Sequence, residues 1–594
     1  MSTRLGTGGR FLDRGRPLEF TFNGKRMKGY QGDTLASALL ANGQTLVGRS
    51  FKYHRPRGIV ASGAEEPNAL VNLGRDGRFE PNQRATTQEL FDGLTAESQN
   101  HWPSLEFDVG VVNNYASKFL PAGFYYKTFM SPRPAWKHVF EPFIRKSAGL
   151  GRAPVDRDAD IYEHFHLHVD ILVIGGGIAG LAAAKQAAAS GASVLVVEQT
   201  AHWGGRAPVD AGEIDGVPAG EWVKNAVEEL DRMDNVRMIT RCMGSGVYDH
   251  GSVLAYERLT DHDPQDGKPR HRLWRIRAKH VITATGAIER PLSFAGNDLP
   301  GVMLAGAVRD YAVNWGVSAG DRTVVVTNND DAYRTAFALV EAGLKVAAIV
   351  DARATPQGPL IEKARAMGIR VETGRGVAKV KGRARVEGVA ITTQAGEGAV
   401  LETIPCDVVA MSGGWSPVVH LWSHCGGKLT WDDTQAFFRP DRTKAPTGDK
   451  GQAFVTVVGS ANGMLATAKV LADAHAGGGS VAEAVKGKAP EASPAPQAEA
   501  ETPAPIEPVW MMPQRASHEL RSKMWLDYQN DVKVSDVQLA AREGYESVEH
   551  TKRYTTLGMA TDQGKLSNIN GLAVLAQSLN AEIPAVGTTT FRPP

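Results

Sequence analysis

Three glycines and one acid are the residues of this chain whose types and spacing most clearly indicate a chemical role. Gly175, Gly177 and Gly180 follow a G-x-G-x-x-G pattern, and Glu198 ends the next predicted strand. The first glycine of such a turn allows a tight bend, the second lets a diphosphate approach the backbone, and the third lets a helix pack on a strand. The acid can accept hydrogen bonds from a ribose diol, so these residues predict a dinucleotide-binding site.

The segments around the glycines have the composition of the elements that must position them. Residues 170–174 are apolar enough for a buried parallel strand, the alanine-rich residues 181–190 predict a helix, and residues 193–197 predict a second strand. A glycine-rich turn without a ligand is the alternative, and the agreement of strand, helix and acid counts against it. Residues at the helix start and beside the acid complete the predicted contacts: Ile178, Ala179 and Gln199.

Three later motifs resemble those that surround the cofactor in flavoproteins with two dinucleotide-binding domains. A Gly-Gly-Arg loop follows Glu198, a Thr-Gly pair ends a predicted strand, and a Gly-Ser pair follows another. The arginine can pair with a pyrophosphate; a plain turn with an exposed arginine is the alternative. Flavin-binding relatives usually have Gly-Asp in place of Gly-Ser, so we predict NAD here and leave FAD open. The predicted cofactor-binding residues of these motifs are Gly205, Arg206, Thr285, Gly286, Gly459 and Ser460.

A second unit that resembles a Rossmann domain begins at Thr323, but its turn lacks the glycines that a phosphate needs. Thr327, Asn329 and Ala332 stand at the three glycine positions. A side chain at the second position blocks close approach of the backbone. We therefore predict a nested domain without an ordinary nucleotide site.

The composition limits the classes of function. The chain has 594 residues, a net charge of +1 and three cysteines, Cys242, Cys406 and Cys425. This predicts several domains and gives no electrostatic argument for binding nucleic acid or an anionic membrane. The scattered cysteines, with no C-x-x-C, argue against a disulfide framework, an iron–sulfur site or a disulfide reductase. We find neither the apolar core of a signal peptide nor an apolar run long enough to span a membrane, and we predict a cytoplasmic protein.

Three alternating histidines are the only pattern that suggests a metal. His164, His166 and His168 would share one face of a strand. No cluster of cysteine or aspartate accompanies them, so solvated or hydrogen-bonded imidazoles are the preferred interpretation and no metal site is predicted.

The first hundred residues resemble a small ferredoxin-like domain. An Asn23-Gly24 turn predicts a hairpin, and a helix is expected over residues 35–42 after Asp33 or Thr34. The iron–sulfur members of that group carry R-G-x-x-C-x4-C-x2-C. Arg57 and Gly58 are present here, and the cysteine positions hold Ala61, Glu66 and Ala69. No soft anionic ligand remains, so we predict the fold without a cluster.

The basic loop at residues 49–57 is either a phosphate or partner contact or a solvated loop. The C-terminal region, with helices predicted at 535–542 and 547–554, resembles a small domain that holds further cluster cysteines in iron–sulfur relatives. Those positions hold Asp527, Gln529, Asp562 and Ser567.

We therefore predict an α/β protein with the Rossmann-type fold of flavoproteins that have two dinucleotide-binding domains. A ferredoxin-like β-grasp unit opens the chain and a small helical unit closes it. The predicted parts are 1–110 (ferredoxin-like, without a cluster), 111–165 (an aromatic wrapping segment), 166–320 with 400–485 (dinucleotide-binding domain), 321–399 (nested degenerate Rossmann-like domain), 486–508 (Ala/Pro/Glu linker) and 509–594 (small helical domain without cysteine).

Taken together, these blocks resemble the alpha subunit of heterotetrameric sarcosine oxidases and are close to alpha subunits of dye-linked proline dehydrogenases. The resemblance implies oxidative demethylation of sarcosine by oxygen, which yields glycine, hydrogen peroxide and a formaldehyde equivalent that tetrahydrofolate can capture. It implies NAD in this chain, FAD in a beta subunit, FMN at the alpha–beta interface, and beta, gamma and delta partners. The family continues past an R-P-P segment into a folate-binding domain. This sequence stops at Arg592-Pro593-Pro594, so we expect that domain to be absent or on a separate chain.

Other functions stay open. A free-standing NAD(P)H-dependent flavin oxidoreductase, a nucleotide-bearing scaffold subunit, and an oxidase for proline or another secondary amine are the alternatives. We assign no catalytic residue, because no histidine pairs with an acid in a recognisable motif and hydride chemistry belongs to the cofactor.

Overall fold

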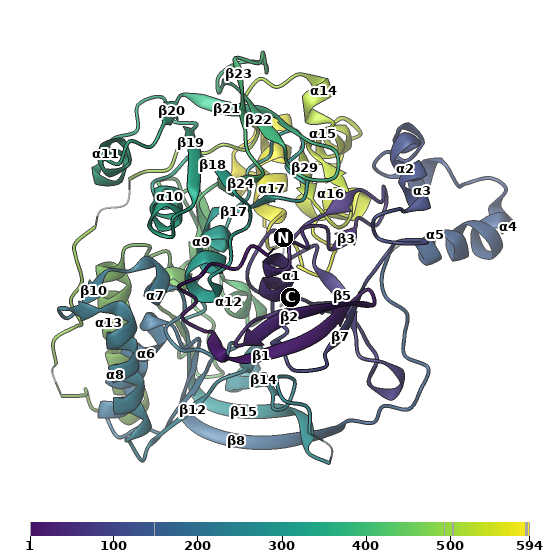
Figure 1. Ribbon diagram of the computed structural model, residues 1–594. Helices are drawn as coiled ribbons and strands as arrows, with labels where there is room; N and C mark the ends of the chain where they lie inside the picture. The colour runs from purple at the N-terminus through teal and green to yellow at the C-terminus, as the bar shows by residue number, and fades with distance from the viewer. Residues whose placement is uncertain are drawn as a thin grey trace.

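The computed structural model describes residues 2–147, 149–265, 267–491, 493–501, 504–588 and 592. In Figure 1 a large sheet that contains β8 and β15 lies at the bottom, a second sheet that contains β18 and β19 lies at the upper left, and C-terminal helices coloured yellow lie beside the second sheet. The predicted α/β architecture with two Rossmann-type sheets is confirmed.

The N-terminal domain is a β-grasp sheet with one helix. Its hairpin turns at Asn23 and Gly24, which both have positive φ, and Phe22 pairs with Lys25. The Thr34 side chain accepts a hydrogen bond from the Ser37 N–H and caps the helix, as predicted. The sheet order is β2-β1-β7-β5-β6. The elements are β1 (Asp13–Phe22), β2 (Lys25–Gln31), α1 (Leu35–Ala41), β3 (Gly48–Arg49), β4 (Pro56–Arg57), β5 (Leu70–Leu73), β6 (Glu80–Arg84) and β7 (Thr95–Ser98).

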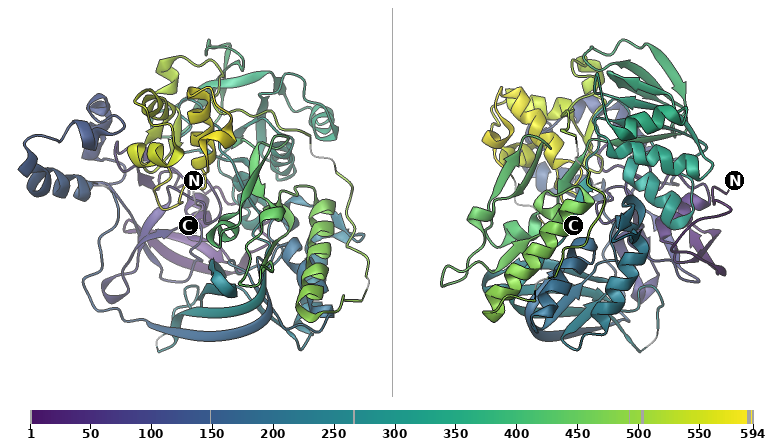
Figure 2. Two further views of the ribbon diagram at one scale, coloured as in Figure 1. Left: turned by 180° about the vertical axis from the view of Figure 1, so that it is seen from behind. Right: turned by 90° about the vertical axis from the view of Figure 1, so that its left-hand side faces the viewer.

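The next segment leaves the body of the molecule as an arm of short helical turns. It projects to the right in Figure 1 and to the left in the reverse view of Figure 2. Its elements are α2 (Val112–Tyr115), α3 (Phe124–Lys127), α4 (Arg133–Ala135), the π-helical turn η4 (Trp136–Phe140) and α5 (Glu141–Ser147).

The dinucleotide-type domain is built on a mixed sheet of order β12-β9-β8-β15-β14-β13, with β28 beside β15. Strand β8 is longer than predicted and starts at Ile161, because its first half pairs in parallel with the long strand β15. Helices α6 and α13 pack against each other and against this sheet in an apolar core that includes alanine, valine and leucine. The main elements are β8 (Ile161–Ile174), α6 (Ile178–Ala189), β9 (Val194–Val197), α8 (Ala219–Asp231), β12 (Val236–Ile239), β13 (Cys242–Tyr248), β14 (Ser252–Arg258), β15 (Pro269–Thr283), β28 (Val455–Val457) and α13 (Thr467–Lys486).

The nested domain has a parallel sheet of order β17-β24-β18-β19-β20. Strands β17 and β24 belong to this sheet although they lie outside residues 321–399, so the unit draws on more of the chain than the predicted range. One continuous apolar core joins it to the N-terminal domain. The elements are β17 (Val302–Leu304), α9 (Ala305–Trp315), β18 (Arg322–Thr327), α10 (Asp331–Glu341), β19 (Lys345–Asp351), α11 (Pro359–Ala366), β20 (Val371–Thr373), β21 (Arg375–Lys381), β22 (Gly388–Thr393), β23 (Glu402–Pro405) and β24 (Val408–Ser412).

The C-terminal unit contains the two predicted helices, α15 and α16, and two that the sequence did not reveal, the short α14 and the longer α17. Its core gathers Met524, Leu526, Val537 and Leu575. The elements are α14 (His518–Arg521), β29 (Trp525–Asp527), β30 (Val532–Lys533), α15 (Val534–Arg542), α16 (Val548–Thr555) and α17 (Asn568–Ser578). Among the described residues, no helix combines the length and apolar character that crossing a bilayer requires.

Candidate dinucleotide site

The turn after β8 has the geometry that its three glycines predict. Gly175 has φ +111°, and a Cβ there would overlap the carbonyl oxygen of Ala284. A Cβ on Gly180 would overlap the carbonyl oxygen of Gly175, so this glycine lets α6 pack against the turn. Both positions are therefore fixed by the packing of the protein itself.

Gly177 differs from the other two glycines. It has φ −69°, and the nearest atom to a Cβ there would be the Cα of Gly205, 4.0 Å away. Protein packing therefore does not require a glycine at this position, and the missing side chain leaves open space over the start of α6. Gly177 is also the N-cap of α6, and no described side chain caps the helix. The N–H groups of the first turn, which includes Ile178 and Ala179, therefore suit an anion such as a diphosphate.

Glu198 lies directly beside this turn. Its Oε2 accepts a hydrogen bond from the N–H of Gly176 at 2.8 Å, and its Oε1 accepts from the N–H and Oγ1 of Thr200 at 2.8 and 2.9 Å. Burial raises the pKa of the Glu198 carboxyl. Oε2 accepts only one of these hydrogen bonds and keeps a second lone pair for a ribose hydroxyl. Gln199, the next predicted contact, is exposed.

The Gly-Gly-Arg loop closes over the turn. The N–H of Gly204 donates to the carbonyl oxygen of Gly176 at 2.8 Å, and Gly205 faces Gly177. The guanidinium of Arg206, however, lies between Asp210 and Asp310, at 2.7 and 2.6 Å. In this structure its charge is compensated by these two acids, so it points to the neighbouring acids and not to the turn.

The two remaining predicted motifs lie near the turn and the start of α6. Ala284, next to Thr285, donates its N–H to Ile174, while the Oγ1 of Thr285 donates to the carbonyl oxygen of Val418 at 2.8 Å. A Cβ on Gly286 would meet no atom within 4 Å. Gly459, with φ +68°, lies against Ala179 at the start of α6, and Ser460 follows it in a 3-10 turn.

Asp473 is a residue at this site that sequence reasoning missed. Its Oδ2 accepts a hydrogen bond from the Gly459 N–H at 2.8 Å, and both its oxygens accept from the Asn462 amide. An acid on α13 thus contacts the turn where flavin-binding relatives carry Gly-Asp. No local motif marks Asp473, because it lies one helix later in the chain.

A network of buried and half-buried charges joins this site to the nested domain and was also not predicted. Arg309 lies 3.1 Å from Asp210 and 3.0 Å from Asp331, and the ring of Trp415 covers Arg206 with its centroid 5.0 Å from the guanidinium carbon. Nearby, Glu289 accepts the Gly306 N–H at 2.7 Å, and burial raises the pKa of Glu289 to about 8. These side chains are far apart in sequence, so no spacing rule could have found them.

Polar side chains at the turn of the nested domain are paired with other residues of the same chain. The Asn328 side chain donates to the carbonyl oxygen of Glu507 at 2.8 Å, so the end of the linker lies against this turn. Asp351, the acid that would hold a ribose, pairs with Arg353 at 2.7 Å and accepts from the Tyr333 hydroxyl at 2.8 Å. These contacts favour the interpretation that this domain lacks an ordinary nucleotide site.

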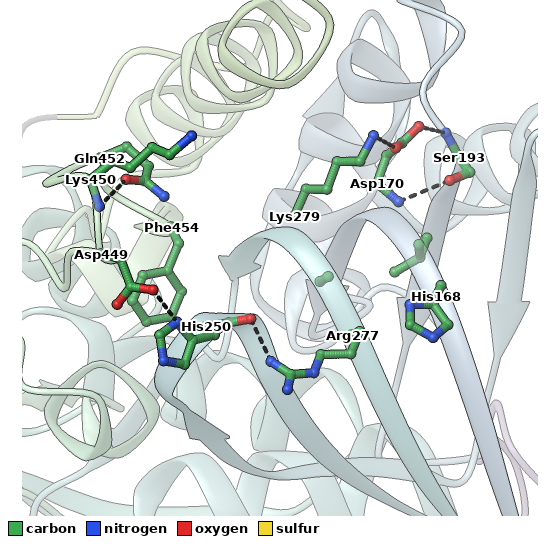
Figure 3. A pocket seen from close by; sticks show the side chains of 13 residues that line it. His168, Asp170, Ser193, His250, Arg277, Lys279, Asp449, Lys450, Gln452 and Phe454 are labelled. Carbon is green, nitrogen blue, oxygen red and sulfur yellow. Dashed lines mark hydrogen bonds and ion pairs between the residues drawn. The ribbon is translucent and has the colours of Figure 1, made fainter.

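A cavity of about 540 Å³ lies elsewhere, next to His168, Asp170, Lys279 and Phe454 (Figure 3). It sits towards the amino-terminal ends of the parallel strands, whereas ligands of this fold bind at the carboxyl ends. Its Lys279 is paired with Asp170 at 2.7 Å. The cavity is therefore not the predicted dinucleotide site. His164, His166 and His168 are exposed on β8, and the described residues hold no group of three or more potential metal ligands.

In the N-terminal domain, the loop that corresponds to the cluster loop of iron–sulfur relatives surrounds a carboxylate. Glu66 is fully buried, and its two oxygens accept four backbone N–H groups at 2.6 to 3.1 Å, from Val60, Ala61, Asn68 and Ala69. Burial raises the pKa of Glu66 to about 7. Backbone N–H groups that would face an anionic cluster face a carboxylate here, and no thiolate is present to hold iron. The residues do not fit an iron–sulfur cluster.

The C-terminal unit shows the same replacement. Asp527 accepts the N–H groups of Asn530 and Gly558 at 2.8 Å, and Asp562 accepts those of Gly564 and Leu566. Burial, and then the charge of Asp562, raise the pKa of Asp527 to about 7. Carboxylates and an amide, Gln529, occupy positions where cysteines stand in iron–sulfur relatives, so this unit is also unsuited to a cluster.

Two arginines of the basic loop are structural. Arg57 is buried and bridges Asp298 and Asp531, the second at 2.6 Å, while Arg55 binds Asp298 at 2.6 Å. They connect the N-terminal domain to the C-terminal unit, and neither of the two interpretations of this loop anticipated that role.

Comparisons with known proteins agree with this architecture. Family models match residues 15–101 (2Fe-2S iron-sulfur cluster binding domain), 169–438 (pyridine nucleotide-disulphide oxidoreductase) and 521–594 (sarcosine oxidase A3 domain). The first match reflects the β-grasp fold, since the cluster ligands are missing. The structure of L-proline dehydrogenase from P. horikoshii matches with a TM-score of 0.66 and 19% identity over 98% of both chains, which confirms the fold.

Curated relatives cover almost the whole chain. The sarcosine oxidase subunit alpha of Rhizobium meliloti (strain 1021) is 45% identical over 98% of this chain and 57% of its own length. That of Corynebacterium sp. (strain P-1) is 38% identical over 98% of this chain and 56% of its own length. The chain therefore spans a little over half the length of these relatives. Over nearly its whole length, the chain therefore resembles the part of the sarcosine oxidase alpha subunits that it shares with them.

Proposed function

We propose that this chain is the nucleotide-bearing alpha subunit of a complex that oxidatively demethylates sarcosine. The substrate reacts with oxygen and water to give glycine, hydrogen peroxide and formaldehyde, or methylenetetrahydrofolate when tetrahydrofolate captures the one-carbon unit. The observation that carries the proposal is 45% identity to a sarcosine oxidase subunit alpha over 98% of the chain. The open space at Gly177 supports a nucleotide in the same chain.

NAD is the nucleotide that we propose for this site. The N–H groups of Ile178 and Ala179 and the positive end of α6 bind the diphosphate, Gly177 leaves room for it, and Glu198 holds a ribose diol. NAD supplies hydride-transfer chemistry when it is bound. The residues described here bind and orient the dinucleotide, and none of them is assigned a proton-transfer role.

FAD and FMN belong to the complex as a whole in this proposal, with FMN near the interface with a beta subunit. Gamma and delta subunits complete the assembly. Electron transfer between the flavins does not pass through an iron–sulfur cluster in this chain, because Glu66, Asp527 and Asp562 occupy the backbone cradles where clusters would lie.

The alternatives have less support. A stand-alone NAD(P)H-dependent flavin oxidoreductase needs a second nucleotide at the nested turn, where Asn328 binds the linker. A nucleotide-bearing scaffold would explain the missing catalytic residues. Proline or another secondary amine is an alternative substrate, for which the likeness to L-proline dehydrogenase supports the fold alone.

Nucleotide release and partner addition separate these functions. The purified chain is heated, and the released nucleotide is identified by chromatography and mass spectrometry. The proposal expects NAD without NADH–flavin turnover from the chain alone, and sarcosine-dependent hydrogen peroxide once the beta, gamma and delta subunits are added. Turnover by the chain alone with bound FAD would favour the reductase. NAD with no activity after partner addition would favour the scaffold.

A further inference from the structure

The arm at residues 109–147, called the aromatic arm below, carries a concentration of exposed large apolar side chains. Of the twenty-two exposed large apolar side chains among the described residues, eight lie in this arm, which is a small fraction of the chain. Tyr115, Phe119 and Phe143 are 78%, 74% and 72% exposed. Exposed apolar side chains concentrated in this way mark an interaction surface.

The base of the aromatic arm is attached to two domains. The Tyr53 hydroxyl donates to the carbonyl oxygen of Leu120 at 2.7 Å. Tyr126 stacks on Tyr554 with ring centroids 6.4 Å apart, and Lys127 pairs with Glu543. The attached base gives the arm a defined position, and the segment beyond it projects away from the body in Figures 1 and 2.

The arm beyond its base has little packing of its own. Phe129 contacts Phe124 and Phe140, with ring centroids 5.8 and 5.0 Å apart. The helical elements are short, and the longest, α5, covers Glu141–Ser147. So few internal contacts bury little of the arm's apolar surface.

The charge of the aromatic arm is strongly basic although the whole chain is nearly neutral at +1. Glu141 is its only acidic residue. The lysines and arginines of the arm are Lys118, Lys127, Arg133, Lys137, Arg145 and Lys146. An apolar surface surrounded by positive charge is complementary to an apolar groove with an acidic rim.

We propose that the aromatic arm is the docking element for a partner protein subunit that presents such an acidic, apolar groove. The inference rests on the proposed function, which requires partner subunits. A second copy of the chain is a poorer occupant, because two basic arms repel each other. A membrane surface is also poorer, because binding in its plane needs a longer amphipathic helix than the short turns of this arm provide.

Apolar substitution tests the docking directly. The chain and the variant Tyr115→Ser/Phe119→Ser/Phe143→Ser are each titrated with the purified beta subunit, and the dissociation constant is measured by surface plasmon resonance. Because the three substituted side chains are exposed, the variant should fold normally, and its urea unfolding midpoint should equal that of the parent chain. We expect the dissociation constant to rise at least about 10-fold. The variant Val400→Ser/Leu401→Ser removes exposed apolar side chains elsewhere and should bind like the parent.

A charge-reversal variant tests the acidic rim. Lys137→Glu/Arg145→Glu/Lys146→Glu should slow association by about 10-fold at low salt, and the difference from the parent chain should shrink as salt is added. An association rate equal to that of the parent would contradict the acidic rim.

The outcomes separate this inference from the proposed function. Parent affinity for the beta subunit in the apolar variant would overturn the docking role and leave the proposed function standing. A parent chain that binds none of the beta, gamma and delta subunits would overturn both. Arm-dependent dimers of the chain alone, or arm-dependent sedimentation with phosphatidylglycerol vesicles when the beta subunit does not bind, would also overturn the assignment to a partner subunit.

Discussion

The carboxylate of Glu198 accepts a hydrogen bond from the backbone N–H of Gly176 at 2.8 Å. This bond connects the end of β9 to the turn at the end of β8. The acid that we propose to hold the ribose also fixes the loop that would hold the diphosphate. Adenosine and pyrophosphate binding should therefore be coupled through one side chain.

Glu198→Gln should weaken nucleotide binding. The amide oxygen can still accept hydrogen bonds. The amide NH₂ group, which only donates, must then face either the Gly176 N–H or the two donors of Thr200. We expect the dissociation constant for NAD, measured by calorimetry on nucleotide-free chain, to rise by about 10- to 100-fold. Glu221→Gln, on the exposed face of α8, should leave it unchanged. Equal affinities of the two variants would argue against the role of Glu198.

Gly177 and Gly180 should respond in opposite ways to an added side chain. A Cβ at Gly177 meets open space, so Gly177→Val should fold normally and lose its nucleotide. A Cβ at Gly180 overlaps the carbonyl oxygen of Gly175, so Gly180→Ala should destabilise the fold by roughly 1–3 kcal/mol. Heat-released nucleotide and urea unfolding measure the two effects. Full nucleotide content in Gly177→Val would reject the site.

The buried ion pairs of Arg57 predict a stability effect far from the nucleotide. Asp298→Asn leaves the fully buried guanidinium with one acid, Asp531, instead of two. We expect a loss of roughly 3–5 kcal/mol in the free energy of unfolding. Glu106→Gln breaks the exposed pair with Lys25 and should cost less than about 1 kcal/mol. A cost for Asp298→Asn as small as that of the control would contradict the structural role of the pair.

Asp527 should make stability depend on pH. Its folded pKa is raised to about 7 from 3.8. The folded chain therefore holds a proton that the unfolded chain has released, and stability falls as pH rises from about 4 to about 7. Asp527→Asn should reduce this fall by roughly 1–4 kcal/mol. The difference in the free energy of unfolding between pH 5 and pH 8 is measured by urea unfolding. The variant Asp234→Asn, at an exposed position, is the control. If Asp527→Asn showed the same dependence of stability on pH as the parent chain, the raised pKa of Asp527 would be contradicted.

Local signals in the sequence were sufficient for part of this structure. Glycine spacing predicted the turn at Gly175, and Asn23-Gly24 predicted a hairpin that Phe22 and Lys25 close. Both features depend on the backbone freedom of neighbouring residues, which the sequence shows directly.

Features that depend on distant residues were not predictable. Strand β24 inserts between β17 and β18, a parallel pairing that no local pattern specifies. Arg206 was expected to face the pyrophosphate, whereas in the structure it binds Asp310 from another part of the chain. Helix α17 was missed because Asn568, Asn570 and Gly571 have low helix propensity, while the burial of Leu572 and Leu575 in the core stabilises it.

The composition of the purified chain tests the central claim most directly. Adenine dinucleotide released by heat is quantified beside iron and acid-labile sulfide in the same sample. The account predicts one adenine dinucleotide per chain and neither iron nor sulfide. Iron and sulfide in stoichiometric amounts, or no adenine compound at all, would contradict it.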